Sequence, residues 1–234
     1  MIKAKNIYKQ IGNTPILKNI NLELNKGEVN VLFGPSGSGK TSLCRNLALL
    51  DYPDKGEIEI LGNAHSFPTK EKIKNLPYPK IGFVYQQLFL WPHLTNKENI
   101  LLALGNDIEN RKEQFEELIE LLEIREIIER YPNEASIGQK QRVAIARTLI
   151  LNPDFIFLDE ITSALDIVQT KKIIALIETL KNKKVVTLII THNLEMFEKI
   201  ADKMIFINRG RIVEIGTNEI LKNPKSKDLK QFIT

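Results

Sequence analysis

The sequence is poor in cysteine and has no long apolar run. Its single cysteine, Cys44, cannot form a disulfide within the chain, which excludes a fold held together by disulfides, and we expect it in the core. No uninterrupted apolar stretch approaches the ~20 residues that span a bilayer. Because the N-terminus lacks the apolar segment of a secretory signal, we expect the protein to remain in the cytoplasm.

A strong excess of one charge is also lacking. The 33 Lys and Arg residues are scattered among 29 Asp and Glu residues, for a net charge of +4. Nucleic-acid binders usually gather basic residues into a patch or stripe, so we expect no nucleic-acid partner. The composition, 43% hydrophobic and 26% charged, is that of an ordinary globular protein, and 234 residues allow one large domain or a domain with an insertion.

Seven apolar segments bounded by turn signals predict β-strands. Three of them, residues 29–33, 155–158 and 185–190, are apolar on both faces, as in strands covered on both sides of a mostly parallel sheet. Arg209-Gly210 separates the last of the seven from residues 211–215, which predicts a β-hairpin. The core is therefore expected to be α/β. The other four predicted strands are residues 16–24, 57–61, 81–85 and 204–207.

Residues 87–152 carry no strand signal. Phe115, Leu118, Ile119 and Leu122 within this stretch recur at spacings of three and four, the period of an amphipathic helix. We therefore predict a helical subdomain inserted into the α/β core. A second apolar helical pattern over residues 168–180 precedes the strand at 185–190 and fits the covering helix of a βαβ unit.

The segment at residues 34–41 has the pattern of a phosphate-binding loop, with glycines, a lysine and a hydroxyl residue at fixed positions. A predicted strand precedes it and helix-compatible residues follow, so its backbone amides would converge on an anion at a helix N-terminus. Lys40 adds a positive charge near the β and γ phosphates, and Thr41 offers its hydroxyl to Mg²⁺. We therefore predict ATP and Mg²⁺ as cofactors. The predicted ATP-binding residues here are Gly34, Pro35, Ser36, Gly37, Ser38, Gly39, Lys40, Thr41 and Ser42.

Two adjacent carboxylates, Asp159 and Glu160, end the predicted strand that begins at Phe155. Ligands of α/β sheets bind at the carboxyl ends of strands, and this position suits the metal and water chemistry of phosphoryl transfer. We assign Asp159 to Mg²⁺ and Glu160 to polarising the attacking water. Alone, such a pair could equally be a solvated strand end, and the neighbouring phosphate loop is what favours catalysis.

Three further motifs lie near that strand. Residues 136–142, Ser-Ile-Gly-Gln-Lys-Gln-Arg, precede it, and Ser-Ala-Leu-Asp at 163–166 and Thr191-His192 follow it. With the phosphate loop, the carboxylate pair and Gln86, they complete six motifs in the order of an ABC-type ATPase domain, which the whole chain resembles. The resemblance implies one ABC ATPase domain over residues 1–234, with a P-loop NTPase core of mixed, mostly parallel sheet. It also implies an N-terminal antiparallel β subdomain and a helical subdomain over residues 87–152 that carries the signature motif.

The resemblance also assigns roles. Gln86 is similar to the glutamine that contacts Mg²⁺ and water in the family, and His192 is similar to the histidine that contacts the γ-phosphate. Two such domains close head to tail in the family, so each ATP lies between one phosphate loop and the other domain's signature motif. A homodimer, or a pair with another ATPase subunit, is therefore implied. The residues that would reach the partner's ATP are Ser136, Gly138, Gln139 and Asp166.

Taken alone, Ser136 could be only a helix cap. A Ser followed three residues later by Gln139 is the capping-box pattern, which would point a helix N-terminus at the partner's γ-phosphate. The sequence departs from the family at Ile137, because the family's usual run is Leu-Ser-Gly-Gly-Gln. A β-branched residue there could strain the turn or slow closure of the dimer.

Two other departures concern the base and the catalytic strand. Ile11 occupies the position at which the family usually stacks an aromatic ring on adenine, and we predict a weaker apolar contact with the base there. Ile161 replaces the proline that commonly follows the glutamate, and we expect little effect from it.

Residues 87–95 are unusually apolar for a loop that leads into a helical region. The family receives a short helix of the membrane subunit on this surface, and Phe89 and Trp91 are the anchors we predict. Simple packing of the helical subdomain on the core is the alternative. This segment and the tail around residues 223–232 resemble ATP-binding subunits of polar amino acid importers, which implies permease subunits, indirectly a solute-binding protein, and a location on the inner face of the cell membrane.

The motifs are also compatible with other functions. A lipoprotein-release or cell-division type of ABC ATPase is one alternative. A DNA-repair member would need a long coiled-coil insertion, and only about fifty residues separate Gln86 from Ser136. A catalytically slow nucleotide-binding regulator is suggested by Ile137 and Ile11, but retention of Glu160 and His192 argues against it.

Overall fold

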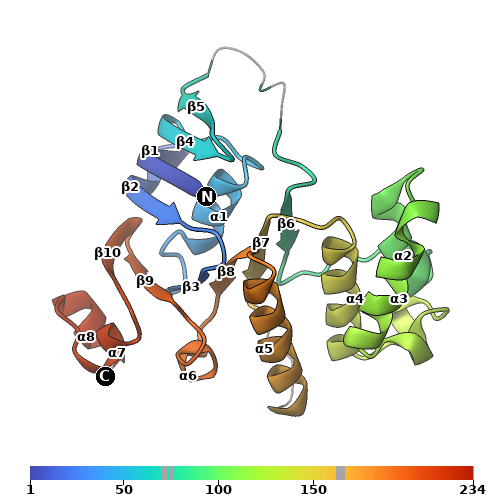
Figure 1. Ribbon diagram of the computed structural model, residues 1–234. Helices are drawn as coiled ribbons and strands as arrows, with labels where there is room; N and C mark the ends of the chain where they lie inside the picture. Colours follow the sequence, from blue (N-terminus) through green and yellow to red (C-terminus); the bar gives the residue numbers. More distant parts are fainter. Residues whose placement is uncertain (70–72, 74–75, 162–166, 234) are drawn as a thin grey trace.

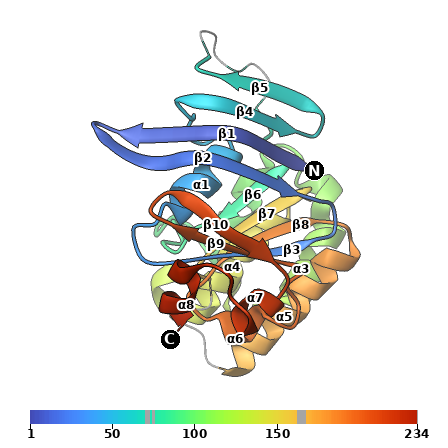
Figure 2. The same ribbon diagram turned by 90° about the vertical axis from the view of Figure 1, so that its left-hand side faces the viewer.

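The computed structural model describes residues 1–69, 73, 76–161 and 167–233, and these form two β-sheets with helices around them. One sheet is antiparallel, with the strand order β2-β1-β4-β5. It forms the upper part of the molecule in Figures 1 and 2. Its strands are β1 (Ile2–Ile11), β2 (Thr14–Leu24), β4 (Lys55–Ile60) and β5 (Asn63–Phe67).

The second sheet has the order β10-β9-β3-β8-β7-β6 and is parallel except for β10, which pairs antiparallel with β9. Every residue of β3, β7 and β8 is buried, as expected for strands that are apolar on both faces. The strands are β3 (Val29–Phe33), β6 (Ile81–Val84), β7 (Phe155–Asp159), β8 (Val186–Ile190), β9 (Lys203–Asn208) and β10 (Arg211–Gly216).

Helices lie on both sides of the parallel strands, and α2, α3 and α4 form a group on the right of Figure 1. None of the helices in the described part of the chain has the length and hydrophobicity that a membrane crossing requires. The α-helices are α1 (Lys40–Leu47), α2 (Asn96–Leu101), α3 (Lys112–Leu121), α4 (Ile137–Leu149), α5 (Ile167–Asn182), α6 (Leu194–Phe197), α7 (Glu219–Lys222) and α8 (Lys227–Ile233). Short 3₁₀ helices are η1 (Leu102–Leu104), η2 (Glu109–Arg111), η3 (Arg125–Ile127) and η4 (Pro132–Glu134).

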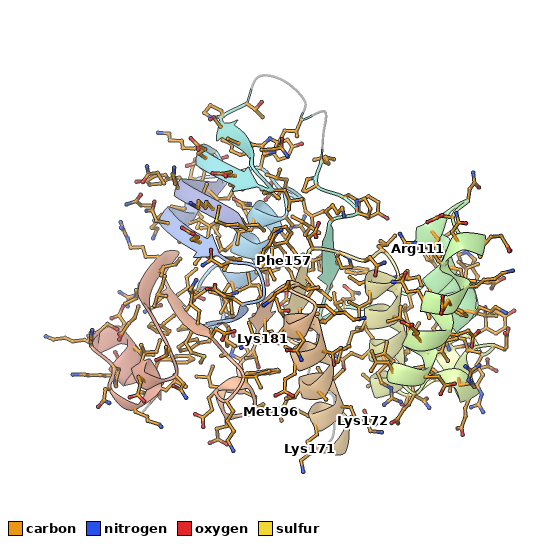
Figure 3. All side chains as sticks on the ribbon, viewed as in Figure 1. Arg111, Phe157, Lys171, Lys172, Lys181 and Met196 are labelled. Carbon is orange, nitrogen blue, oxygen red and sulfur yellow. The ribbon has the colours of Figure 1, made fainter. Side chains whose placement is uncertain are left out.

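Two apolar clusters hold these layers together. One joins α1 and the antiparallel sheet to one face of the parallel strands, and Phe157 of β7 lies within it near the centre of the molecule (Figure 3). The other joins the opposite face of the same strands to α3, α4 and α5. Cys44 is fully buried in the first cluster, and burial raises its pKa, so the thiol is a core residue as predicted.

The predicted α/β fold is confirmed, and all eight strands expected from the sequence are present to within one or two residues at most ends. Two strands were missed. β1 carries Lys and Asn among its apolar residues and has three register irregularities against β2, with Asn6 at a φ of 51°, so its apolar pattern does not alternate regularly. β5 is a short edge strand in which only Phe67 is buried.

Candidate functional site

The phosphate loop lies between β3 and α1 and is shaped by glycines at two close approaches. Gly34 has a φ of 151°, and a Cβ there would lie 2.0 Å from the carbonyl oxygen of Ile207. Gly39 has a φ of 103° and stands immediately before α1, where a Cβ would lie 3.0 Å from the carbonyl oxygen of Ile16. A side chain would clash at Gly34 and would be strained at Gly39, so both positions favour glycine, and the loop between them leads directly into the N-terminus of α1.

The Lys40 side chain is hydrogen-bonded to the backbone of the phosphate loop. Its Nζ donates hydrogen bonds to the carbonyl oxygens of Gly34, at 2.8 Å, and Pro35, at 2.9 Å. Burial lowers the pKa of Lys40, while the carboxylates of Glu160 and Asp159 oppose that shift. The ammonium therefore stabilises the loop and faces the two acids, and a phosphate group would compete with the loop carbonyls for it.

Thr41 and Asp159 bring two oxygens together beside the loop. Thr41 Oγ1 donates a hydrogen bond to Asp159 Oδ2 at 3.0 Å. Asp159 ends β7 and is buried, and this burial raises the pKa of its carboxyl, with Thr41 and Lys40 acting in the opposite direction. A buried carboxylate with one hydroxyl partner is the kind of group that a cation would stabilise.

Glu160 lies between Gln86 and His192. Gln86 Nε2 donates to Glu160 Oε2 at 3.0 Å, and His192 Nε2 lies 2.7 Å from Glu160 Oε1. The Glu160 backbone has a φ of 51°, which is unfavourable for a non-glycine residue, and its N–H bonds to the Ile190 carbonyl oxygen at 2.9 Å. The structure thus brings together three predicted catalytic side chains from three different segments around one carboxylate.

The signature residues form a separate structure. Ser136 caps α4, its side chain accepts from the Gln139 N–H at 3.3 Å, and Gln139 Oε1 accepts from the Ser136 N–H at 2.8 Å. The predicted capping box is therefore present. These side-chain bonds join Ser136 and Gln139 to each other and not to the phosphate loop of the same chain. Gly138 is buried in the first turn of α4.

Ile137 does not strain the turn, contrary to one of the two effects considered from the sequence. It is the first residue of α4, where a helical backbone suits an L residue, and its side chain is 59% exposed. Ile11 ends β1 with its side chain exposed beside the Gly12-Asn13 turn, and Ile161 is buried. Asp166 lies outside the described residues.

Arg147 and Asn99 were missed by sequence reasoning. The Arg147 guanidinium, on the last turn of α4, donates to the carbonyl oxygens of Leu88 and Phe89, both at 2.7 Å. Asn99 bonds to the backbone of residues 91–95. Both side chains hydrogen-bond to backbone atoms, and because every residue has the same backbone atoms, no sequence motif marks such partners.

Phe89 and Trp91 are 57% and 51% exposed. Phe89 has a φ of 48° and touches Tyr85 edge to face, with ring centroids 5.4 Å apart. Tyr85 and Arg147 also line an apolar groove of about 310 Å³ next to this segment. Leu50, Leu76, Tyr78 and Phe83 are among the other residues of that groove.

Comparison with known proteins supports what this geometry suggests. The family model described as ABC transporter matches residues 17–163, well over half of the chain. The chain belongs to the ABC transporter family. It is an ATP-binding and ATP-hydrolysing member of that family.

Several relatives of this ABC ATPase align over its whole length. The arginine transport ATP-binding protein ArtP of Haemophilus influenzae is 36% identical over 100% of this chain and 99% of its own. The glutamine transport ATP-binding protein GlnQ of Escherichia coli is 37% identical, and the arginine transport ATP-binding protein ArtM of Bacillus subtilis is 38% identical, each over 100% of this chain and 98% of its own.

A solved structure is similar in both fold and sequence. The ATP-binding cassette MJ0796, a dimer in a post-hydrolysis state bound to ADP and Pi, is 32% identical with a TM-score of 0.84. The alignment covers 93% of this chain and 99% of that cassette. The ABC ATPase fold predicted from the sequence is thereby confirmed.

Proposed function

We propose that this ABC ATPase powers the import of polar amino acids. Full-length similarity to relatives named for arginine and glutamine transport carries the transport part of the proposal. The placement of Glu160 between Gln86 and His192, next to the phosphate loop, carries the catalytic part.

Mg²⁺ is proposed as the second cofactor, held by Thr41 and Asp159 with Gln86 nearby. The fit rests on two oxygens, Thr41 Oγ1 and Asp159 Oδ2, that already lie 3.0 Å apart beside the phosphate loop. An ion held by these two oxygens would take its remaining ligands from substrate phosphates and water. When bound, Mg²⁺ neutralises charge on the phosphate oxygens.

In the proposed mechanism, Glu160 polarises the attacking water. Hydrogen bonding from Gln86 and contact with His192 fix both carboxylate oxygens, so the group is oriented before the water arrives. His192 also contacts the γ-phosphate in this scheme. Lys40 moves its hydrogen bonds from the carbonyl oxygens of Gly34 and Pro35 to the phosphates, where its charge opposes that of the transferred group. Ile11 supplies apolar contact to the base.

A second copy of the chain, or a paired ATPase subunit, is proposed to complete the site. Among the described residues, the Ser136 side chain is hydrogen-bonded to Gln139 and not to the phosphate loop of its own chain. Helix α4 therefore begins with a capped N-terminus that suits an anion. Gly138 and Gln139 lie in the same turn, and Asp166 is assigned to the same interface. The dimeric state of a 32% identical cassette supports this arrangement.

Permease subunits are proposed to dock on the exposed Phe89 and Trp91, in the helical subdomain that we place at residues 87–152. The adjoining apolar groove offers a partner helix further buried area. The chain would then work at the inner face of the membrane, and a solute-binding protein would contact it only through the permease.

A transport assay tests the proposed function. The chain would be reconstituted in proteoliposomes with a polar amino acid permease and a solute-binding protein from its own organism, and uptake of labelled arginine and glutamine would be measured with ATP inside. We expect uptake that stops with Lys40→Ala, because that variant loses the charge at the β and γ phosphates, and nucleotide binding or turnover is lost with it. ATP hydrolysis without uptake of any polar amino acid would refute the importer assignment and leave the ATPase intact.

A further inference from the structure

Asn99 is a fully buried asparagine whose side chain binds main-chain groups of one exposed segment. Its Oδ1 accepts from the Trp91 N–H at 2.7 Å. Its Nδ2 donates to the carbonyl oxygens of Trp91, at 3.0 Å, Leu94, at 3.1 Å, and Thr95, at 3.0 Å. One amide on α2 thus fixes both ends of residues 91–95, which we call the docking turn.

The geometry specifies asparagine at this position. A flipped amide would place its NH₂ against the Trp91 N–H and its oxygen against three carbonyl oxygens, so the network itself fixes the orientation. An aspartate would turn every donor bond into contact between oxygens, and a leucine of the same branching would fill the space without any bond. Buried main-chain groups left unpaired in this way are costly.

The docking turn presents its largest side chain, Trp91, outward. Trp91 is 51% exposed, and its ring meets His93 edge on, with centroids 5.7 Å apart. Beneath it, the turn has one further main-chain bond of its own, from the Leu94 N–H to the Trp91 carbonyl oxygen at 3.3 Å. Asn99 therefore supplies most of the hydrogen bonds that hold the backbone under Trp91.

We propose that Asn99 is a positioning residue for permease recognition, which holds Trp91 in the geometry that a permease subunit binds. The inference rests on the proposed docking of the permease at Phe89 and Trp91. Large exposed aromatic residues act as interface anchors, and holding an anchor in its bound geometry removes the entropy cost of ordering it during binding. Loss of Asn99 should thus weaken docking without removing any side chain from the docking surface.

Asn96 offers a matched control. It lies on the same helix and is equally buried, but its Nδ2 donates to the Ile127 carbonyl oxygen at 2.8 Å, which is outside the docking turn. Asn96→Leu and Asn99→Leu remove the same chemical group from the same helix. Only Asn99→Leu releases the backbone of Trp91.

The first measurement needs no partner, because Trp91 is the only tryptophan of the chain. Time-resolved fluorescence anisotropy of the purified full chain reports motion of its ring directly. We expect a larger fast-decaying amplitude in Asn99→Leu than in wild type, and an unchanged decay in Asn96→Leu. Equal decays in wild type and Asn99→Leu would overturn the inference.

The second measurement is the affinity of this chain for the permease used in the transport assay, embedded in lipid nanodiscs. Wild type, Trp91→Ala, Asn99→Leu and the double variant form a double-mutant cycle. We expect Asn99→Leu to weaken binding by about tenfold, the loss from one interface side chain that must be ordered on binding, and to have little further effect once Trp91 is alanine. ATP binding by the isolated chain should not change.

The outcomes separate this inference from the proposed docking site. If Trp91→Ala and Phe89→Ala both bind the permease normally, the proposed site is wrong. If Trp91→Ala weakens binding but Asn99→Leu does not, the site stands and the role of Asn99 is refuted. If the losses of permease affinity in Trp91→Ala and Asn99→Leu simply add in the double variant, Asn99 has a general structural role. The same conclusion holds if Asn96→Leu, at a matched melting temperature, loses as much affinity as Asn99→Leu. Should Asn99→Leu fail to fold, Asn99→Ser provides the same comparison with a smaller side chain that cannot reach the turn.

Discussion

At the scale of single residues, Asp159 and Glu160 show how adjacent acids acquire different properties. Asp159 ends a buried strand with one hydroxyl partner, whereas Glu160 contacts Gln86 and His192. The burial of the Asp159 carboxylate lowers the stability of the nucleotide-free protein, as is common for residues of a functional site.

That cost predicts a pH-dependent effect of Asp159→Asn. Burial raises the pKa of Asp159 above its ordinary 3.8, so the side chain favours the fold only when protonated, and this contribution is lost as the pH rises through the raised value. Without nucleotide, Asp159→Asn should therefore melt at a higher temperature than wild type at pH 7, and the difference should disappear below pH 3.8. Thermal unfolding across this pH range checks it. A lower melting temperature for the variant at pH 7 would contradict the assigned cause.

A second residue-scale prediction concerns Asn46 in α1. This side chain is fully buried, and neither its nitrogen nor its oxygen has a hydrogen-bond partner among the described residues. Asn46→Leu keeps the branching and removes two unpaired polar atoms, so we expect a gain of about 1–2 kcal/mol in the free energy of unfolding. Urea unfolding measures it, with Asn96→Leu as a variant that breaks a real bond and should lose stability. A lower free energy of unfolding for Asn46→Leu would show that the Asn46 side chain has a hydrogen-bond partner in solution.

At the scale of elements, two helices begin with the same capping box. Ser136 is the N-cap of α4 and Thr95 is the N-cap of α2, and each side chain accepts a hydrogen bond from the N–H three residues later. Loss of either hydroxyl to alanine should cost about 1 kcal/mol, or roughly 2–4 °C in melting temperature for a chain of this size.

The two caps should differ in function. Because Ser136 is proposed to face the partner's ATP, Ser136→Ala should lower ATP hydrolysis and ATP-driven dimerisation of the isolated chain, whereas Thr95→Ala should leave both near wild type. Steady-state phosphate release measures hydrolysis by the two variants, and light scattering measures their dimerisation. Equal activity of Ser136→Ala and Thr95→Ala would show that Ser136 acts only as a helix cap.

Element by element, the sequence predicted most of the fold because buried strands and phosphate loops depend on local pattern. Val29–Phe33 is apolar except for Asn30, and both of its ends agree with the prediction. β1 and β5 were missed because bulges and an exposed edge disrupt the alternation that marks a strand. The candidate site residues were predicted from motifs, and their roles remain predictions. Their contacts were not predicted, because the Glu160 N–H bonds to Ile190 and the Arg147 guanidinium bonds to residues 88 and 89, all far away in sequence.

At the scale of the whole molecule, two surfaces of this ABC ATPase are proposed to be functional. The phosphate loop, the two acids and His192 lie at the carboxyl ends of the parallel strands, where we propose that they form one half of an ATP site. Ser136 lies at the start of α4, and the other end of α4 holds residues 88 and 89 through Arg147. One rigid helix thus connects the surface proposed for the ATPase partner with the surface proposed for the permease.

The central claim is that two copies close on ATP and that Glu160 then drives hydrolysis. Glu160→Gln removes the base but keeps the size of the side chain, so ATP should bind and the closed dimer should persist. Size-exclusion chromatography with light scattering, run with Mg²⁺ and ATP, should show a dimer of Glu160→Gln that hydrolyses ATP at least about a hundredfold more slowly than wild type. A monomer under these conditions, or hydrolysis at the wild-type rate, would contradict the account.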